Sequence, residues 1–429
     1  MKRNNRILLI AILIIAVILS TLSGCTSIKS YLDKLIDSAQ QNSNTNKSSS
    51  NSEVAPNSDT VSPTSKTQPG QQEPTPTVKP AKSSTTSQVY VVSAKPASVQ
   101  GPSSEAVTVS DTNAFYDLVV SSVAQGKDLT VTLQGSIQKD EIADNAIKIA
   151  NDSGFSGYIT NIEYSIDKNI AYIHFNYKGG KDHYLASINA VNSKVQEIVN
   201  AVVKPDMSDY DKELALHDYV VNNVNYDYEN LVAGSIPDDS YTAYGALIKG
   251  TAVCQGYAES MYRLLNKAGI KTFMVTGSGN NVPHAWNIVS IGGDYYHLDA
   301  TFDDPVSSSG NKPTYNYFNL SDAQISKDHS FNTANYPKCT STLANYFVVN
   351  NLIANNKTDF YNIIKKGLLN KSPVIRCKTT AYSPSIYTPN IISDILRDNP
   401  KINYLNLTKG FFYNYDPNSF VMEIYMTYK

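Results

Sequence analysis

Cys254, His284 and Asp299 are the residues of this chain whose types and order are best suited to chemistry. A thiol is a poor nucleophile near neutral pH unless something favours its thiolate. An imidazole beside it can take and return a proton, and a carboxylate can orient that imidazole. The three residues therefore predict a Cys, His, Asp catalytic triad, and the elements around them must bring them together.

The residues after Cys254 have the spacing of an amphipathic helix. The apolar positions that recur at this spacing are Ala258, Met261, Leu264, Leu265 and Ala268. Gly269 then marks the end of a helix of about four turns. Cys254 is expected in the first turn, where unpaired N–H groups and the helix dipole favour a thiolate. Gly256 is expected to leave the N-terminal end of the helix without a side chain at this position, so that an acyl group can approach.

A hairpin is predicted to bring His284 and Asp299 together. Gly292-Gly293 separates two runs of β-type residues, which is a strong signal for a two-residue turn. With these glycines at its centre, opposed residues have numbers that sum to 585, as 292 and 293 do. Trp286 then faces Asp299, and His284 lies one diagonal step away on the same face. A slip of one residue would separate the two side chains.

These motifs resemble the transglutaminase-like superfamily, whose core is similar to that of papain-type cysteine peptidases. The likeness covers about residues 206 to 329, including Tyr317-Phe-Asn-Leu-Ser321 downstream of the triad. It implies an α+β fold in which the helix with Cys254 packs on an antiparallel sheet that carries His284 and Asp299. It implies no cofactor. The superfamily includes peptidases, amidases, crosslinking transferases and inactive members.

Several neighbours of the triad have simpler interpretations. Trp286, the only tryptophan, fits core packing as well as a wall of the site. His297 and His217 are expected to be structural, and Asp303-Asp304-Pro305 is expected to form a turn. The backbone N–H of Cys254 is expected to hold part of the oxyanion.

A second oxyanion donor is needed beside that N–H. The sequence assigns the role to neither Tyr226 nor Tyr244.

Length and composition limit the function classes. The 429 residues suggest two to four domains. A net charge of -2 argues against a nucleic-acid partner. The sequence contains no Cys/His spacing typical of zinc, no glycine-rich phosphate loop and no calcium-loop pattern, so it predicts no metal and no cofactor.

The first 24 residues read as a lipoprotein signal peptide. A basic start and a short apolar run lead to Leu22-Ser-Gly-Cys25, which resembles a lipobox, so Cys25 is expected to carry lipid. An uncleaved anchor is the alternative. Either way the body of the protein is expected outside the cytoplasmic membrane, on the cell surface. Residues 25–105 are rich in Ser, Thr, Asn and Pro, and they predict a disordered tether.

Two similar modules are expected on either side of the catalytic domain. Residues 106–200 form the first, 201–340 the transglutaminase-like catalytic domain, and 341–429 the second. Asn113-Ala-Phe-Tyr resembles Asp359-Phe-Tyr, and each copy predicts helix, strand, helix and hairpin. The copies can bind wall polymer or brace the enzyme. Cys339 and Cys377 can pair or stay free.

The sequence as a whole predicts a cell-surface cysteine acyl-transfer enzyme that acts on peptide or carboxamide bonds. Its expected partner is a protein or peptide substrate, cell-wall peptide included, and its oligomeric state is left open. Hydrolysis is favoured over transfer to an amine, because a crosslinking enzyme must exclude water and the sequence shows no device that would do so. The alternatives are a protein-crosslinking transglutaminase and a non-catalytic module that binds wall or protein.

Overall fold

A computed structural model of the chain describes residues 71–72, 90–93, 106–135, 142–305, 313–402, 404–405 and 411–428. The chain divides into two compact units, Met1–Thr67 and Gln68–Lys429, and all described residues belong to the second. The expected signal peptide and Cys25 lie outside the described residues, as does most of the expected tether. Within the described part, no helix is long and apolar enough to cross a bilayer.

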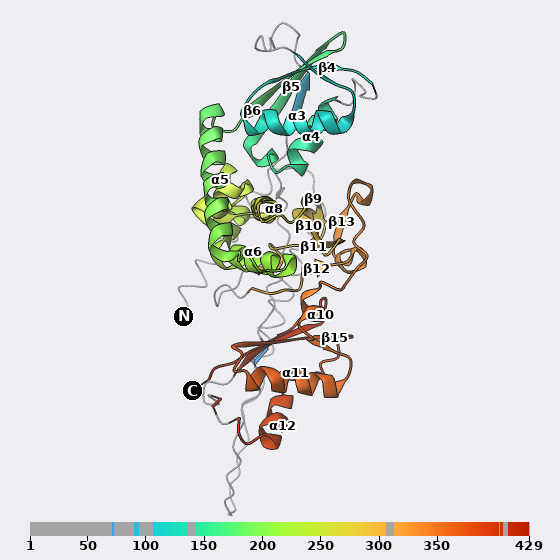
Figure 1. Cartoon of the computed structure of the whole chain (residues 1–429). Coiled ribbons are helices and arrows are strands. Elements are labelled where there is room, and N and C mark those ends of the chain that lie inside the picture. The colour runs from blue at the N-terminus through green and yellow to red at the C-terminus, as the bar shows by residue number, and fades with distance from the viewer. Residues whose placement is uncertain are drawn as a thin grey trace, which may run out of the picture. The chain divides into compact units, whose positions relative to one another are not determined.

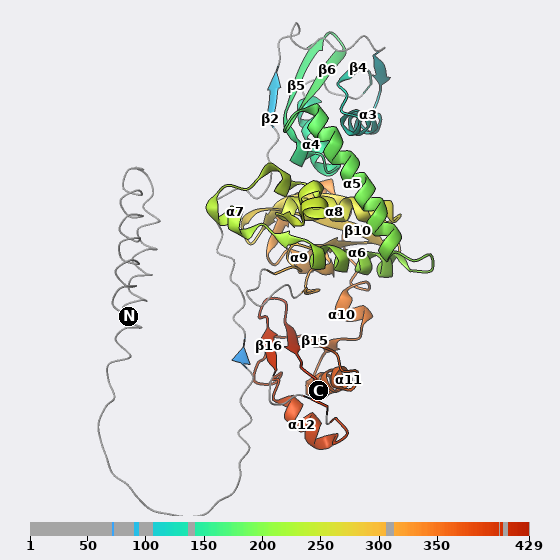
Figure 2. The same ribbon diagram turned by 90° about the vertical axis from the view of Figure 1, so that its left-hand side faces the viewer.

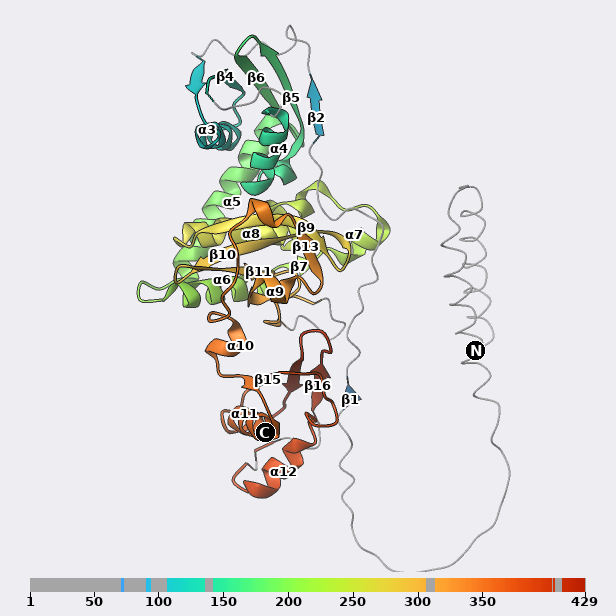
Figure 3. The ribbon, with the colours of Figure 1, turned by 90° about the vertical axis from the view of Figure 1, so that its right-hand side faces the viewer.

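The central domain contains a five-stranded sheet in the order β12-β11-β10-β9-β13. Its strands are β9 (Thr272–Gly279), β10 (Val282–Ile291), β11 (Asp294–Leu298), β12 (Phe318–Leu320) and β13 (His329–Phe331). All four pairings are antiparallel. Helix α8 (Cys254–Lys267) packs across β10 and β9 (Figure 3). The α+β fold expected for this domain, with a helix on an antiparallel sheet, is confirmed.

The hairpin of β10 and β11 has the expected register. Its pairs run from Ile291 opposite Asp294 to Asn287 opposite Leu298, and each pair sums to 585. Gly292 and Gly293 form the turn with φ angles of 62° and 92°, which only glycine adopts easily.

The ladder ends one pair short of the site. Asp299 donates its N–H to Tyr317 O at 3.1 Å. The pairing of Trp286 with Asp299 expected from the sequence is not part of the ladder.

Smaller elements complete the central domain. They are α6 (Asp209–Asn223), β7 (Asn225–Tyr226), α7 (Tyr228–Ala233), η3 (Asp238–Tyr241), η4 (Gly245–Lys249), β8 (Thr251–Ala252), α9 (Asp322–Ile325) and η5 (Thr333–Asn335). Helix α6 packs against α8 (Figure 2), and β7 pairs in parallel with β8. The short β7–β8 ladder therefore lies directly before the start of α8.

Helix α5 (Lys181–Val202) belongs to two cores at once. Tyr184 and Ile188 are buried in the core of the N-terminal module. Val191, Val195 and Ile198 are buried in the core of the central domain. The boundary expected at residue 200 therefore falls inside one continuous helix, because its apolar face changes partner along its length.

Each flanking module is a sheet with two helices (Figure 1). The first contains β3 (Val107–Val109), α3 (Thr112–Ala124), β4 (Leu129–Leu133), α4 (Ile142–Asp152), η2 (Ser156–Tyr158), β5 (Ile159–Asp167) and β6 (Ile170–Tyr177). The second contains β14 (Ile353–Ala354), α11 (Lys357–Leu369), β15 (Val374–Thr379), α12 (Ile391–Asp398), β16 (Phe412–Tyr415) and β17 (Val421–Tyr425). Helix α10 (Tyr346–Val349) precedes the second module.

The two module sheets have corresponding topologies. The strand orders are β2-β5-β6-β4-β3 and β1-β16-β17-β15-β14, where β1 spans Gln71–Gln72 and β2 spans Tyr90–Ser93. Matching pairs also run in the same sense, parallel for β3–β4 and β14–β15 and antiparallel for β4–β6 and β15–β17. Both modules thus have the element order that a repeat requires. That the two modules superpose as copies stays a prediction.

The expectation of a disordered tether is wrong for two short segments. β2 (Tyr90–Ser93) pairs in parallel with β5, and β1 (Gln71–Gln72) pairs in parallel with β16. Both add a strand to the open edge of a module sheet, where unpaired backbone groups offer a template. For β2, the Tyr-Val-Val sequence also favours a strand.

Glu213 on α6 is fully buried, and it provides a test of the central core. Burial raises its pKa to about 8, against the hydrogen bond from Asn319 Nδ2 at 2.7 Å. Between about pH 4.5 and 8 the folded chain therefore keeps a proton that the unfolded chain releases, so stability falls as pH rises through this window.

Glu213→Gln is expected to remove that pH dependence. Thermal unfolding should show the variant to be more stable than the wild type near pH 7.5, by on the order of 1–3 kcal/mol, with no gain near pH 4.5. Glu197→Gln on the exposed face of α5 is the control and should not change the slope. Parallel pH profiles for wild type and Glu213→Gln would contradict the buried neutral carboxyl.

Candidate active site

Cys254 is the first residue of α8, as expected. Val253 precedes it in extended conformation, with φ −94° and ψ 178°, and donates its N–H to Ser240 O at 2.8 Å. The β7–β8 ladder holds the chain just before this point. The Cys254 side chain is fully buried. The thiol is therefore fixed at the positive end of a helix and shielded from solvent.

The expectation for Gly256 is wrong. A Cβ added there would lie 2.7 Å from Ala252 Cβ, 2.8 Å from Thr242 O and 2.9 Å from Ser240 O. The space beside Gly256 is filled by the segment that precedes α8. Glycine is required because the helix packs closely against this backbone, and it opens no path for an acyl group.

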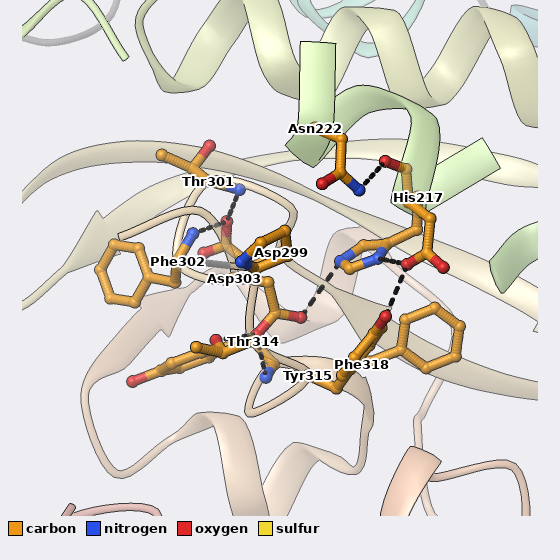
Figure 4. A network of polar contacts seen from close by, with 12 residues as sticks. His217, Asn222, Asp299, Thr301, Phe302, Asp303, Thr314, Tyr315 and Phe318 are labelled. Carbon is orange, nitrogen blue, oxygen red and sulfur yellow. Dashed lines mark hydrogen bonds and ion pairs between the residues drawn. The ribbon is translucent and has the colours of Figure 1, made fainter. Parts of the chain in front are cut away.

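His284 and Asp299 are in direct contact, as expected from the hairpin. His284 Nε2 lies 2.7 Å from Asp299 Oδ2, and both side chains are buried. The other carboxylate oxygen, Oδ1, accepts the backbone N–H groups of Thr301 and Phe302 at 3.0 and 3.1 Å (Figure 4). Asp299 is thus oriented on both sides, and the turn after β11 fixes the plane of its carboxylate.

The electrostatics of the pair favour a charged imidazole. Burial opposes a charge on His284, but the Asp299 carboxylate and the hydrogen-bonded Cys254 raise its pKa to about 10. Burial likewise opposes a charge on Asp299, yet His284 and His329 hold its pKa well below the usual range. Since Nε2 of His284 is taken by Asp299, Nδ1 is the nitrogen left for the thiol. An imidazolium in that position stabilises a thiolate.

His329 is a member of the site that sequence reasoning missed. Its Nε2 lies 3.0 Å from Asp299 Oδ2, the oxygen that His284 also contacts. It lies on β13, which pairs with β9 and not with the predicted hairpin. The only signal in the sequence was the polar pair Asp328-His329 at the end of the segment that resembles the superfamily.

Trp286 both packs in the core and lines the site. Its ring stacks on that of His284, with centroids 5.8 Å apart and an interplanar angle of 18°. Its Nε1–H donates to His297 Nδ1 at 3.0 Å, and His297 Nε2 lies 2.9 Å from Asp322 Oδ1. His297 does not touch the triad, which agrees with the expected structural role.

A buried ion pair fixes the turn that follows Asp299 (Figure 4). His217 Nε2 on α6 lies 3.3 Å from Asp303 Oδ2, and both side chains are fully buried. Asp303 Oδ1 accepts the Thr314 hydroxyl at 3.0 Å and the Tyr317 N–H at 2.9 Å. Asp303 N–H in turn donates to Asp299 O at 3.1 Å. The expected turn is present, and its carboxylate ties α6 to the loop that carries Asp299.

Two tyrosines lie close to the thiol. Tyr226 lies opposite Ala252 in the β7–β8 ladder, and Ala252 is two residues before Cys254. Burial, followed by the neighbouring Cys254 and Asp299, raises the pKa of Tyr226 well above its usual value. Burial and Cys254 also raise the pKa of Tyr241, which the sequence did not single out. Both phenols stay protonated at neutral pH and are hydrogen-bond donors.

The N-terminal module touches the segments beside the thiol. Gln255 Nε2 donates to Ser156 Oγ at 2.9 Å in buried surroundings. A Cβ on Gly157 would lie 2.5 Å from Tyr241 O, so the module backbone packs closely against the end of η3. The module therefore packs directly against the segments on either side of the thiol.

Two trios of described residues have potential metal ligands within 4.8 Å of one another: His284, Asp299 and His329, and His297, Asp322 and Cys339. In the first, Asp299 Oδ2 already receives both imidazoles at 2.7 and 3.0 Å. In the second, the Trp286 N–H points at His297 Nδ1. A metal on Nε2 would require a hydrogen on Nδ1, which would then confront the indole hydrogen. Neither trio fits a metal.

Comparison with known proteins identifies the central domain. Residues 196–300 match the sequence profile of the transglutaminase-like superfamily. The chain therefore contains a transglutaminase-like domain, which spans the helix with Cys254 and the hairpin with His284 and Asp299. No curated protein matches the chain.

Several solved structures are similar in part. A "TGase" is 16% identical over 44% of this chain and 54% of its own, with a TM-score of 0.25. A protein from Cytophaga hutchinsonii, described as a candidate cysteine protease, is 23% identical over 29% of this chain and 41% of its own, with a TM-score of 0.22. An arylamine N-acetyltransferase from Bacillus cereus with a Cys-His-Glu triad is 13% identical over 44% of this chain and 83% of its own, with a TM-score of 0.22. The chain spans about half or less of the first two. At these TM-scores the likenesses carry no weight for function.

Proposed function

We propose that the chain is a cysteine acyl-transfer enzyme that acts on peptide or carboxamide bonds, most simply as a peptidase or amidase. The observation that carries the proposal is the continuous contact from Cys254 through His284 to Asp299, with the thiol at the start of a helix. A non-catalytic binding module would have no use for a buried imidazolium held between a thiol and a carboxylate.

Each residue has a defined step in this reaction. Cys254 Sγ attacks the carbonyl carbon, and the carbonyl π electrons move to oxygen. When the tetrahedral intermediate collapses, the C–N bond breaks and His284 gives its proton to the departing amine. A second nucleophile then loses a proton to His284, attacks the thioester and releases Cys254 as thiolate. Asp299 keeps the imidazole in orientation throughout.

The oxyanion needs hydrogen-bond donors close to Sγ. The backbone N–H of Cys254 belongs to the first turn of α8 and supplies one. Tyr226 or Tyr241 supplies the second, because both hydroxyls stay protonated beside Cys254. The ring of Tyr244 lies under Lys249 Nζ, which is 5.6 Å from its centroid.

Transfer to an amine is the second candidate, and one observation favours it. Cys254 is fully buried, and only 4% of His284 is exposed, so bulk water has little access to an acyl-enzyme. Exclusion of water is what a transferase requires. A substrate carbonyl reaches Sγ only when a neighbouring side chain moves.

A product assay distinguishes the two reactions. The wild type is incubated with a generic peptide and with a glutamine-containing peptide, each with and without a primary amine. The masses of the products are then measured by mass spectrometry. Cleavage or loss of ammonia alone supports hydrolysis, and incorporation of the amine supports transfer. The proposal fails if the wild type produces neither product and forms no covalent adduct with a peptide electrophile.

The enzyme is proposed to act on the outer face of the cell membrane, anchored by lipid on Cys25. The support is the lipobox-like Leu22-Ser-Gly-Cys25 after a basic start and an apolar run. Cys25→Ala is expected to release the protein from the membrane fraction or to block its processing, as seen by fractionation and intact mass. Cys254→Ala is the cysteine control and should stay in the membrane. Normal cleavage with full membrane retention of Cys25→Ala would rule out lipid attachment there.

A further inference from the structure

His329 has a carboxylate oxygen at each of its two ring nitrogens. Nε2 lies 3.0 Å from Asp299 Oδ2, and Nδ1 lies 2.6 Å from Asp328 Oδ1. The ring is buried, while the Asp328 side chain is 21% exposed and also accepts the Tyr317 hydroxyl on Oδ2 at 2.6 Å. The imidazole therefore bridges a deeply buried carboxylate and one that reaches the surface.

This geometry favours a doubly protonated ring. An ionised carboxylate only accepts hydrogen bonds, and a neutral imidazole has a hydrogen on one nitrogen alone. With both carboxylates ionised, only the ring with both N–H hydrogens satisfies the two contacts.

The backbone is shaped to let two imidazoles reach the same oxygen. Strand β9 lies between β10 and β13, and Gly277 and Gly279 stand opposite His284 and His329 in the two ladders. A Cβ on Gly279 would lie 3.0 Å from His284 Cδ2 and 3.0 Å from the Phe302 ring. The missing side chain at Gly279 thus leaves room for the His284 ring, whose centroid lies 5.3 Å from that of His329.

We propose that His329 is a positioning residue: a permanently protonated second imidazole that holds the Asp299 carboxylate in place and keeps the His284 imidazolium able to give up its proton. This role rests on the proposed acyl transfer. Asp299 alone would bind the proton of His284 tightly. A second cation on the same oxygen offsets part of that attraction, so that the proton can pass to a leaving amine.

Few titratable groups face the His329 ring among the described residues. They are Asp299, Asp328, His284, His297 and, through Asp328, Tyr317. The two carboxylates favour the charge on His329, and the charge on His284 opposes it. Burial also opposes the charge, but the hydrogen bonds to both aspartates raise the pKa of His329 above its ordinary value.

Two variants separate charge from shape. His329→Gln removes the cation and keeps an amide N–H for Asp299. Asp328→Asn keeps the ring and its bond to Asp299, but it removes the negative charge at Nδ1 and so favours the neutral ring. His217→Gln is the matched control, because His217 is also a buried imidazole that faces two aspartates, Asp218 and Asp303, without touching Asp299.

The readout is nitrogen-15 NMR of labelled histidines in the full chain, which needs no substrate. In the wild type, His329 should show both ring N–H groups near pH 7.5. Both variants should lose this signature and move the titration of His284 upward by on the order of two pH units, as for unit charges 5.3 Å apart at an effective dielectric constant of about 20. His217→Gln should do neither. In His329→Gln and Asp328→Asn, the decrease in kcat should be larger than the increase in KM.

A neutral His329 in the wild type would overturn the proposal. So would an unchanged His284 titration in both His329→Gln and Asp328→Asn, and Asp328→Asn decides the case if His329→Gln does not fold. A wild type in which His329 keeps both hydrogens but His284 is neutral would support this charge assignment and count against the acyl-transfer mechanism.

Discussion

Cys254→Ala is expected to abolish turnover and leave the fold in place. Loss of the nucleophile from a serine-enzyme triad costs on the order of 10⁶ in kcat, and no other thiol touches His284 in the described part of the chain. The stability cost should be about 1 kcal/mol, because one buried sulfur atom is removed at the end of a helix. The measurements are turnover and thermal unfolding on the same sample.

Cys377→Ala is the matched control for this experiment. Cys377 is also fully buried, but it lies in the core of the C-terminal module. It should lose a similar amount of stability and keep full turnover. If Cys254→Ala retains activity, or unfolds far earlier than Cys377→Ala, then Cys254 is a packing residue and the binding-module alternative takes the place of the enzyme.

Asp299→Asn is expected to lower turnover by about 10⁴, as in a serine-enzyme triad. Here the reason is visible in the geometry. Oδ1 can keep its bonds from Thr301 and Phe302, so an amide NH2 would replace Oδ2 and face the N–H groups of His284 and His329. Donors would then meet donors, and at least one imidazole must turn away. A loss of about 1–3 kcal/mol in stability should accompany the change, since buried donors lose their partner.

Asp303→Asn tests whether the effect is specific. Asp303 is a fully buried carboxylate in the same turn, and it faces His217 and Thr314 instead of the triad. It should cost comparable stability with a much smaller loss of kcat. Equal losses of kcat in the two variants would mean that Asp299 acts only through the integrity of the turn.

The sequence predicted those parts of the site that local structure determines. Gly292-Gly293 sets the register of one hairpin, and that register places His284 and Asp299 on one face. The spacing of apolar residues places Cys254 at the start of α8. Both inferences depend on residues close together in the chain, where turn chemistry and periodicity are informative.

Long-range packing determined what the sequence did not reveal. His329 reaches Asp299 because β13 joins the far edge of β9, and no periodicity encodes this pairing. Gly256 was misread because the backbone of Ser240 and Thr242, in and just after η3, fills the space beside it. The end of the N-terminal module was placed at residue 200, since a helix shared between two cores looks like any other amphipathic helix.

The central claim is that Cys254 is chemically activated, and selective alkylation tests it most directly. Cys254, Cys339 and Cys377 are all fully buried, so access alone does not distinguish them. Burial raises the pKa of Cys377 to about 12 and that of Cys339 still further, and only Cys254 contacts an imidazolium. The native protein is treated with iodoacetamide near pH 6, where ordinary thiols of pKa about 8.5 are protonated, and the adducts are mapped by mass spectrometry. Modification should occur at Cys254 in preference to the other two and should be lost in His284→Gln. Equal labelling of the three cysteines, or labelling of Cys254 that is unchanged in His284→Gln, would contradict the account.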